Sequence, residues 1–235
     1  MTSFSFEQIG TIHSPYKEKF AVPRQPGLIQ DGGGELHLHA PYNQPEAVRG
    51  LEEFSHLWVM FVFHQTMDGG WRPTVRPPRL GGNTRTGVFA TRSTFRPNPL
   101  GMSLVELKGI HCQGQHVILQ LGSLDLVDGT PVVDIKPYLP FAESHPEARA
   151  GFAQHAPQAD MPVEFSPQAE KQLADNVRKY PHLRRFITQV LGQDPRPAYR
   201  KGEADERDYA VRLLEFNVRW RVVGSVNQVL SLGND

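Results

Sequence analysis

The longest apolar run in the sequence, residues 57–63, places the strongest limit on the fold. It reads Leu-Trp-Val-Met-Phe-Val-Phe, which is rich in aromatic and β-branched residues. Seven residues are few for a helix, whereas this composition suits a strand buried on both faces. A membrane-spanning helix needs about 18 apolar residues, and no run in the sequence approaches that length. We therefore predict a soluble protein with this run as its central strand.

Several shorter stretches also have the composition of strands, and turn signals at Asp31-Gly32, Gly114 and Asp128-Gly129 separate them. One short helix is indicated, at residues 46–54, and the 21 glycines and 20 prolines disfavour a helical bundle. We predict a mainly β fold, in which an antiparallel sheet closes on itself as a barrel within residues 1–145. Its other strands are expected at residues 4–12, 34–39, 86–91, 102–110, 116–121 and 131–135.

Beyond the predicted barrel the sequence changes character. Residues 146–165 are rich in Ala, Gln and Pro without periodicity, which indicates a linker or surface loop. A helix is predicted to begin at Ser166-Pro167, and a second helix carries an apolar stripe over residues 183–191. Strand-like residues follow at 209–223. We predict a small α+β domain over residues 166–235.

Charge and cysteine content narrow the class of protein. The 25 basic and 25 acidic residues cancel, so no overall positive field draws the chain to nucleic acid or to a membrane. The lone Cys112 allows neither an intramolecular disulfide nor a cysteine zinc site, and the pair His37-x-His39 has no third ligand nearby. The N-terminus has no basic region followed by an apolar stretch. We expect a cytoplasmic protein that uses no metal.

Basic charge is nevertheless segregated in one segment, residues 69–105. A solvated basic face is one interpretation, but such a face would normally mix lysine with arginine and tolerate glutamate. Arginine binds phosphate or carboxylate through a rigid bidentate fork, so the pattern favours recognition of an anion or of RNA. The segment contains no acidic residue, no lysine and six arginines: Arg72, Arg76, Arg79, Arg85, Arg92 and Arg96.

A second polar segment, residues 124–138, has strand alternation from Val132 onward. This alternation puts Asp134 and Lys136 on one face, with Tyr138 beyond them. A carboxylate and an ammonium group would then converge at a strand end, where they could serve a site. From spacing alone, a surface ion pair is an equally good interpretation.

Two motifs carry a family resemblance. Residues 87–101 read Gly-Val-Phe-Ala-Thr-Arg-Ser-Thr-Phe-Arg-Pro-Asn-Pro-Leu-Gly, and residues 124–138 read Leu-Asp-Leu-Val-Asp-Gly-Thr-Pro-Val-Val-Asp-Ile-Lys-Pro-Tyr. Together with residues 15–27, 63–65 and 194–202, they resemble the TrmO family, also called TsaA-like or YaeB-like. The resemblance implies a β-barrel rather than a Rossmann fold, and a homodimer. It also implies an S-adenosylmethionine-dependent methyltransferase that acts on N6 of threonylcarbamoyladenosine beside the anticodon of threonine tRNA.

The resemblance also assigns residues to the cofactor and to the RNA. Arg92 is expected to pair with the methionine carboxylate, and Asp125 to attract an amine-bearing or cationic part of the cofactor. The cofactor-binding residues carried over from the family are Arg24, Gln25, Pro26, His64, Gln65, Arg92, Met102, Leu124, Asp125 and Leu126. The modified nucleotide and the anticodon loop are expected to contact Arg96, Asn98, Tyr199, Arg200 and Lys201.

The chemistry needs only a modest general base, because N6 lies between a purine and a urea carbonyl and its hydrogen is more acidic than that of plain adenine. We expect Asp134 to accept this proton. Lys136 and Tyr138 would polarise the ureido carbonyl or hold the threonyl carboxylate.

The proline-stiffened basic loop at residues 194–201 is predicted to help complete the active site, in its own or in the neighbouring subunit. Phosphate contacts are expected from Arg196, Arg200 and Lys201. The alternative function is a non-catalytic module that binds RNA or a small anionic ligand through the arginine-rich face.

Overall fold

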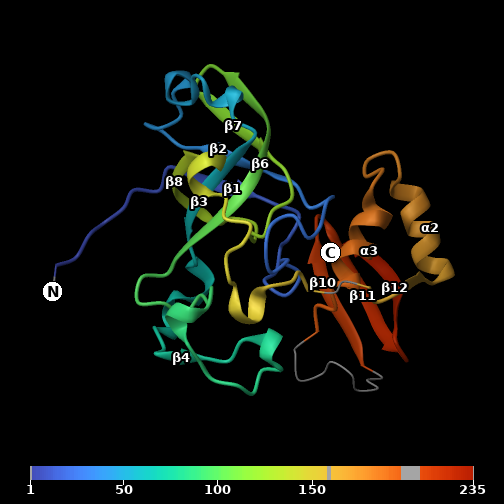
Figure 1. The fold of residues 1–235 in the computed structure, drawn as a ribbon. Coiled ribbons are helices and arrows are strands. Elements are labelled where there is room, and N and C mark those ends of the chain that lie inside the picture. Colours follow the sequence, from blue (N-terminus) through green and yellow to red (C-terminus); the bar gives the residue numbers. More distant parts are fainter. Residues whose placement is uncertain (1, 158–159, 197–206, 235) are drawn as a thin grey trace.

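A computed structural model of the chain describes residues 2–157, 160–196 and 207–234. Six antiparallel strands close into a barrel in the spatial order β1-β2-β7-β6-β3-β8 (Figure 1), which confirms the predicted mainly β fold. The strands are β1 Gly10–His13, β2 Gly34–Leu38, β3 His56–Val62, β6 Leu100–Gln113, β7 His116–Leu121 and β8 Pro131–Pro137.

The apolar run that suggested a central strand forms β3, which pairs with β6 on one side and with β8 on the other. Leu57, Val59 and Phe61 are buried in the barrel, whereas Trp58 and Met60 point outward and are partly exposed. The prediction that both faces of this strand are buried was therefore wrong. In a barrel of this size one face of each strand fills the interior, and the other face points away from it.

The N-terminal strand is shorter than predicted. Residues 4–9 form no strand, and β1 begins only at Gly10. Phe4 and Phe6 are 79% and 66% exposed on an extended arm (Figure 1). Period-two alternation alone does not make a strand, because a strand also needs a partner for its backbone hydrogen bonds.

Two further predicted elements are replaced by short turns. Of residues 86–91, only β5 (Thr86–Gly87) pairs as a strand, with β4 (Thr74–Val75). The predicted helix at residues 46–54 is split by Gly50, whose φ of 84° is incompatible with a continuing helix. The short helical elements are α1 Pro140–Glu143 and the 3₁₀ turns Pro45–Val48, Leu51–Glu53, His64–Gly69, Pro78–Leu80, Val88–Ala90 and Gly151–Ala153.

A second sheet, in the order β10-β11-β12-β9, and two longer helices make up a C-terminal α+β unit (Figure 1). The Ser166 hydroxyl accepts a hydrogen bond from the Ala169 backbone N–H at 3.1 Å and so caps the first of these helices. No helix in the described part of the chain is long and apolar enough to cross a membrane. The elements are β9 Val163–Phe165, α2 Pro167–Asn176, α3 Leu183–Gly192, β10 Asp208–Leu213, β11 Phe216–Val223 and β12 Val226–Asn234.

The barrel and the C-terminal unit each have their own buried core, and the N-terminal part of the chain contributes to both cores. Ile12 lies in the barrel core, whereas Tyr16, Ala21 and Ile29 lie in the core of the C-terminal unit with Phe186 of α3. The segment after β1 therefore fastens the barrel to the C-terminal unit. The division into residues 1–145, 146–165 and 166–235 stays a prediction, and β9 adds a strand from within the stretch expected to be a linker.

Candidate active site

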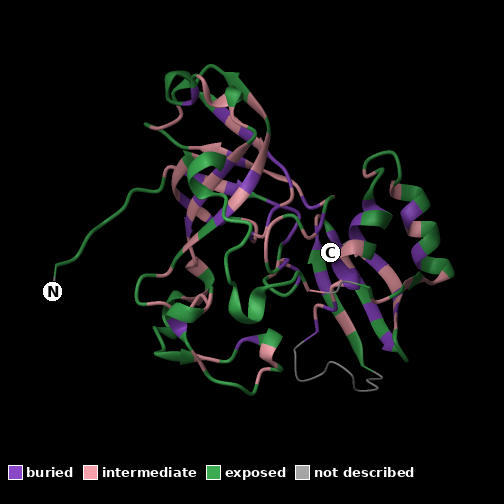
Figure 2. Ribbon diagram, in the orientation of Figure 1, coloured by how far each residue is buried: buried purple, intermediate pink, exposed green. Residues whose placement is uncertain are grey.

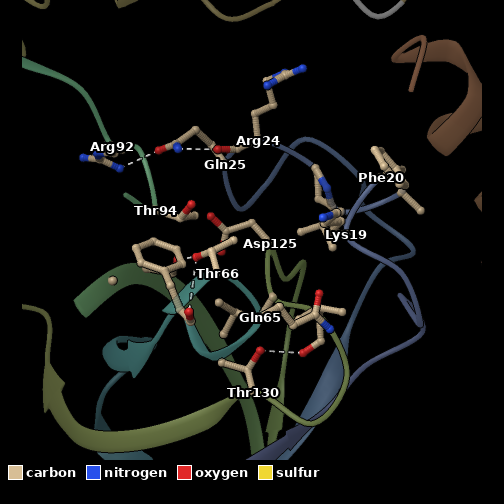
Figure 3. A pocket seen from close by; sticks show the side chains of 18 of the residues that line it. Lys19, Phe20, Arg24, Gln25, Gln65, Thr66, Arg92, Thr94, Asp125 and Thr130 are labelled. Carbon is tan, nitrogen blue, oxygen red and sulfur yellow. Dashed lines mark hydrogen bonds between the residues drawn. The ribbon is translucent and has the colours of Figure 1, made fainter. Parts of the chain in front are cut away.

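A cavity of about 790 Å³ opens between one end of the barrel and the C-terminal unit (Figure 3). The end of β3 and the start of β6 form its barrel side, and residues 19–25 and 91–96 form its rim. The end of α3 closes the remaining side through Val190 and Gln193. The site is thus built by segments that are far apart in the sequence.

The barrel side of the cavity depends on a close contact between β3 and β6. Gly101 of β6 lies opposite Phe61 of β3. A Cβ atom at Gly101 would lie 2.3 Å from the Phe61 ring and 2.9 Å from the Phe63 ring, so only glycine fits here. The two rings meet edge to face with their centroids 5.2 Å apart. They give the cavity an apolar wall.

Asp125 is the acidic centre of the cavity. The hydroxyl of Ser103 on β6 donates a hydrogen bond to Asp125 Oδ1 at 2.6 Å. Burial raises the pKa of Asp125 to about 6, against the smaller opposing effects of the Ser103 hydrogen bond and the Arg92 charge. A partly buried carboxylate of this kind would attract a bound cation more strongly than one in open water.

Arg92 supplies positive charge at the rim of the same cavity. Its Nη1 donates a hydrogen bond to the side-chain oxygen of Gln25, and the Gln25 amide nitrogen donates to the Arg24 carbonyl (Figure 3). The Arg92 side chain is exposed, so it can exchange the Gln25 oxygen for an anionic group of a ligand. The cavity therefore presents a carboxylate inside and a guanidinium at its edge.

Most of the predicted cofactor residues are brought together around this cavity. Its lining includes Arg24, Gln25, His64, Gln65, Arg92, Met102, Asp125 and Leu126. Pro26 and Leu124 do not line it. Leu124 is fully buried in the barrel core, and its backbone N–H donates to the Gly32 carbonyl at 2.9 Å, so it supports the loop that carries Asp125.

The three predicted catalytic residues lie elsewhere, on and just beyond β8. Asp134 and Lys136 form an ion pair of 2.7 Å on the outer face of the barrel, with 44% and 59% of their side chains exposed. Tyr138 packs edge to face against Trp58, with ring centroids 6.3 Å apart. Asp134 pairs with Met60 of β3, and Met60 pairs with the cavity residue Met102 of β6. The ion pair is therefore on the strand next to β3, whose end forms part of the cavity wall, but neither residue lines the cavity, and its catalytic role stays a prediction.

The predicted RNA-binding residues are divided. Arg96 lines the cavity, and its Nη1 donates to the Thr91 carbonyl at 2.8 Å and to the Val88 carbonyl at 3.2 Å. Asn98 is exposed and lies outside the cavity lining. The remaining three, Tyr199, Arg200 and Lys201, lie outside the described residues.

The expected phosphate contact from Arg196 was wrong. Its side chain is only 3% exposed and forms an ion pair with Asp194 at 2.8 Å, so it is not presented to solvent as a phosphate contact. Both residues line the cavity. Asp194 adopts a φ of 49°, a left-handed conformation just after α3, and this turn directs the chain back to the cavity wall. That this segment helps complete the active site stays a prediction.

Two further residues near Asp125 were not anticipated. Ser103 is buried on β6 and carries the hydroxyl that binds Asp125. Tyr16 is fully buried, and burial, followed by the nearby Asp125 charge, raises the pKa of its phenol. Alternation along β6 predicts that Ser103 points inward like Val105, which is the only signal in the sequence for either residue.

Comparisons by sequence and by structure point to the same family. Residues 11–144 match the tRNA-methyltransferase O N-terminal domain, and residues 158–235 match the TrmO C-terminal domain. A tRNA (adenine(37)-N6)-methyltransferase of Escherichia coli K12 is 70% identical over 232 residues, covering 99% of both chains. A putative S-adenosylmethionine-dependent methyltransferase of Pseudomonas aeruginosa, RcsF, is 48% identical over 217 residues, covering 92% of this chain and 91% of that one. A crystal structure of TrmO from P. aeruginosa superposes with a TM-score of 0.81 and 39% identity, covering 100% of this chain and 99% of that one.

Proposed function

Because this chain belongs to the tRNA-methyltransferase O family, we propose that it is an S-adenosylmethionine-dependent tRNA (adenine-N6)-methyltransferase. Its acceptor is N6 of the threonylcarbamoyladenosine beside the anticodon of threonine tRNA. The observation that supports this function best is the cavity between the barrel and the C-terminal unit. It combines a partly buried carboxylate, that of Asp125, with the exposed guanidinium of Arg92 at its edge.

The residues of the cavity fit S-adenosylmethionine. A cavity of about 790 Å³ is within the usual range for a small-molecule site. Arg92 would hold the carboxylate of the methionine part and Asp125 an amine-bearing or cationic part, while Phe61, Phe63 and Leu126 give apolar surface for the adenine. When bound, the cofactor supplies an activated methyl group on a sulfonium. The protein's part is therefore to align the acceptor nitrogen with that methyl and to receive the acceptor's proton.

Asp134 remains our candidate for receiving the N6 proton, with Lys136 and Tyr138 oriented towards the ureido carbonyl or the threonyl carboxylate. Asp134 lies on the outer face of its own barrel, so it reaches a cavity most directly if a second subunit presents it. We propose a homodimer for this reason.

The outer face of the barrel near the cavity supports a dimer. Leu100 and Met102 of β6, which also line the cavity, are 38% and 46% exposed, next to the partly exposed Met60 of β3. An apolar strip of this kind suits a subunit contact. Sedimentation equilibrium should give twice the chain mass of 26.4 kDa, and a mass of one chain at micromolar concentration would exclude the shared site.

The reaction is tested by mass spectrometry of tRNA nucleosides after incubation with the protein and labelled S-adenosylmethionine. We expect label in the threonylcarbamoyladenosine of threonine tRNA and none in a transcript that lacks the threonylcarbamoyl group. Equal labelling of both RNAs would refute the proposed acceptor. The non-catalytic alternative predicts no label, and no saturable heat when S-adenosylmethionine alone is titrated into the protein.

We place the protein in the cytoplasm, where it would meet its tRNA. The exposed thiol of Cys112, the only cysteine, is compatible with a reducing compartment.

A further inference from the structure

The segment from Gly69 to Arg96, which we call the arginine lobe, stands apart from the body of the barrel (Figure 1). Besides short local turns, a two-residue ladder between β4 and β5 and two longer-range backbone hydrogen bonds connect its parts. The Val88 N–H donates to the Pro73 carbonyl at 3.0 Å, and the Arg72 N–H donates to the Phe95 carbonyl at 3.2 Å. Most of its residues are exposed (Figure 2). The lobe contributes little to the core, so its composition is not explained by packing.

The lobe contains six arginines and no acidic residue. Among the described residues, no arginine of the lobe forms an ion pair with a carboxylate. The final pair of the ladder is Val75 with Thr86, and the next residues on the two strands are Arg76 and Arg85, both exposed. Two arginine side chains thus lie at the same end of the ladder, in a protein whose formal net charge is zero. A surface of this kind complements a polyanion.

Exposed aromatic rings lie at the other end of the ladder. Trp71 is 56% exposed and Phe89 is 75% exposed. The hydrogen bond from Val88 to Pro73 extends the β4–β5 pairing by one step; Phe89 follows it in the 3₁₀ turn Val88–Ala90, and Trp71 lies two residues before Pro73. The Arg96 guanidinium lies 5.7 Å from the centre of the Phe89 ring, and Arg96 also lines the cavity. The aromatic end of the lobe therefore borders the cavity through Arg96, and Pro78, two residues after Arg76, also lines the cavity.

We propose that the arginine lobe binds the unpaired nucleotides that flank the target adenosine in the tRNA loop. Trp71 and Phe89 stack on bases next to the one that enters the cavity, and Arg76 and Arg85 bind phosphates of the same RNA strand. This inference rests on the proposed function, because that function supplies the RNA. Exposed rings beside arginines favour single-stranded RNA over an acidic peptide, since unpaired bases have flat faces that stack on aromatic side chains.

The stacking part is tested with the double variant Trp71→Ala/Phe89→Ala in the full-length protein. Binding of threonine tRNA that carries threonylcarbamoyladenosine should weaken about tenfold or more. The affinity for S-adenosylmethionine and the melting temperature should stay at the wild-type values, because both side chains are exposed and outside the cavity lining. The matched control is Phe141→Ala, which removes a ring that is 90% exposed on α1 and should leave tRNA affinity unchanged.

The phosphate part is tested with Arg76→Gln/Arg85→Gln and with Arg76→Lys/Arg85→Lys. The Gln variant should reduce the slope of log K against log salt by about 1.4, or about 0.7 for each lost phosphate contact, and the Lys variant should keep the wild-type slope. Arg49→Gln/Arg178→Gln removes the same charge from exposed positions outside the lobe and should leave the slope unchanged.

The inference is overturned if Trp71→Ala/Phe89→Ala keeps the wild-type tRNA affinity and Arg76→Gln/Arg85→Gln keeps the wild-type salt slope. The proposed function is unaffected by that result if the wild-type protein methylates the tRNA. If the wild-type protein binds S-adenosylmethionine but neither binds nor methylates the tRNA, the proposed function fails and this inference fails with it.

Discussion

At the cavity end of the barrel, the partly buried Asp125 carboxylate lines the cavity and accepts a hydrogen bond from Ser103 at 2.6 Å. On the outer face of β8, the Asp134 carboxylate is partly exposed and pairs with Lys136 at 2.7 Å. The two side chains are identical and only nine positions apart in the sequence. Their surroundings suit Asp125 to holding a cation in a cavity, and Asp134 to acting on a group that approaches from outside the subunit.

The largest expected effect separates these two roles. Asp134→Asn should lower the rate of methyl transfer by about 10²–10⁴-fold, because the proton acceptor is lost. The affinity for S-adenosylmethionine should not change, because Asp134 lies outside the cavity lining. Single-turnover kinetics and calorimetry measure the two quantities. A rate close to that of the wild type would show that the Asp134–Lys136 pair is only a surface ion pair.

A smaller effect is expected at the cavity. Arg92→Ala should weaken S-adenosylmethionine binding by about 1.5–3 kcal/mol, the usual value for a lost hydrogen bond to a charged group. Binding of tRNA should weaken less, because Arg92 is one of six arginines in its segment. Calorimetry measures the affinity for the cofactor, and a filter-binding assay measures the affinity for the tRNA. Equal cofactor affinity in the variant and the wild type would remove Arg92 from the cofactor site.

The smallest expected effect is a dependence of the S-adenosylmethionine affinity on pH. Because the pKa of Asp125 is about 6, the carboxylate is mostly protonated at pH 5 and mostly ionised at pH 7. If it holds a cationic part of the cofactor, affinity should rise up to about tenfold between these values. In Asp125→Asn the affinity should be weaker and should lack this rise. A wild-type affinity that is flat from pH 5 to 7 would contradict a cation contact at Asp125.

The raised pKa of Asp125 also predicts a pH dependence of the free energy of unfolding. The folded protein keeps the Asp125 proton up to about pH 6, whereas the unfolded chain loses it near the ordinary value of 3.8. The contribution of Asp125 to the free energy of unfolding therefore falls as the pH rises from about 4 to 6, and is constant above that range. Asp125→Asn should lack this contribution, which denaturant unfolding at several pH values can measure.

The barrel strands were largely predictable because their patterns are local. Alternation and turn signals located β2, β6, β7 and β8 to within a few residues, and Gly114 and Gly129 mark turns where φ is positive. The same alternation correctly placed Asp134 and Lys136 on one face of β8. It did not reveal which face was outside, since that depends on which residues fill the barrel.

The sequence by itself determined the strand pattern, the segregation of six arginines and the motifs that identify the family. Only the tertiary structure placed the end of α3 in the cavity wall, buried Arg196 against Asp194 and inserted Tyr16 into the core of the C-terminal unit. The physical reason is the range of the interactions. Strand alternation and turns depend on neighbouring residues, whereas a cavity wall depends on side chains such as Asp125 and Val190, which meet only after two separately built cores pack together.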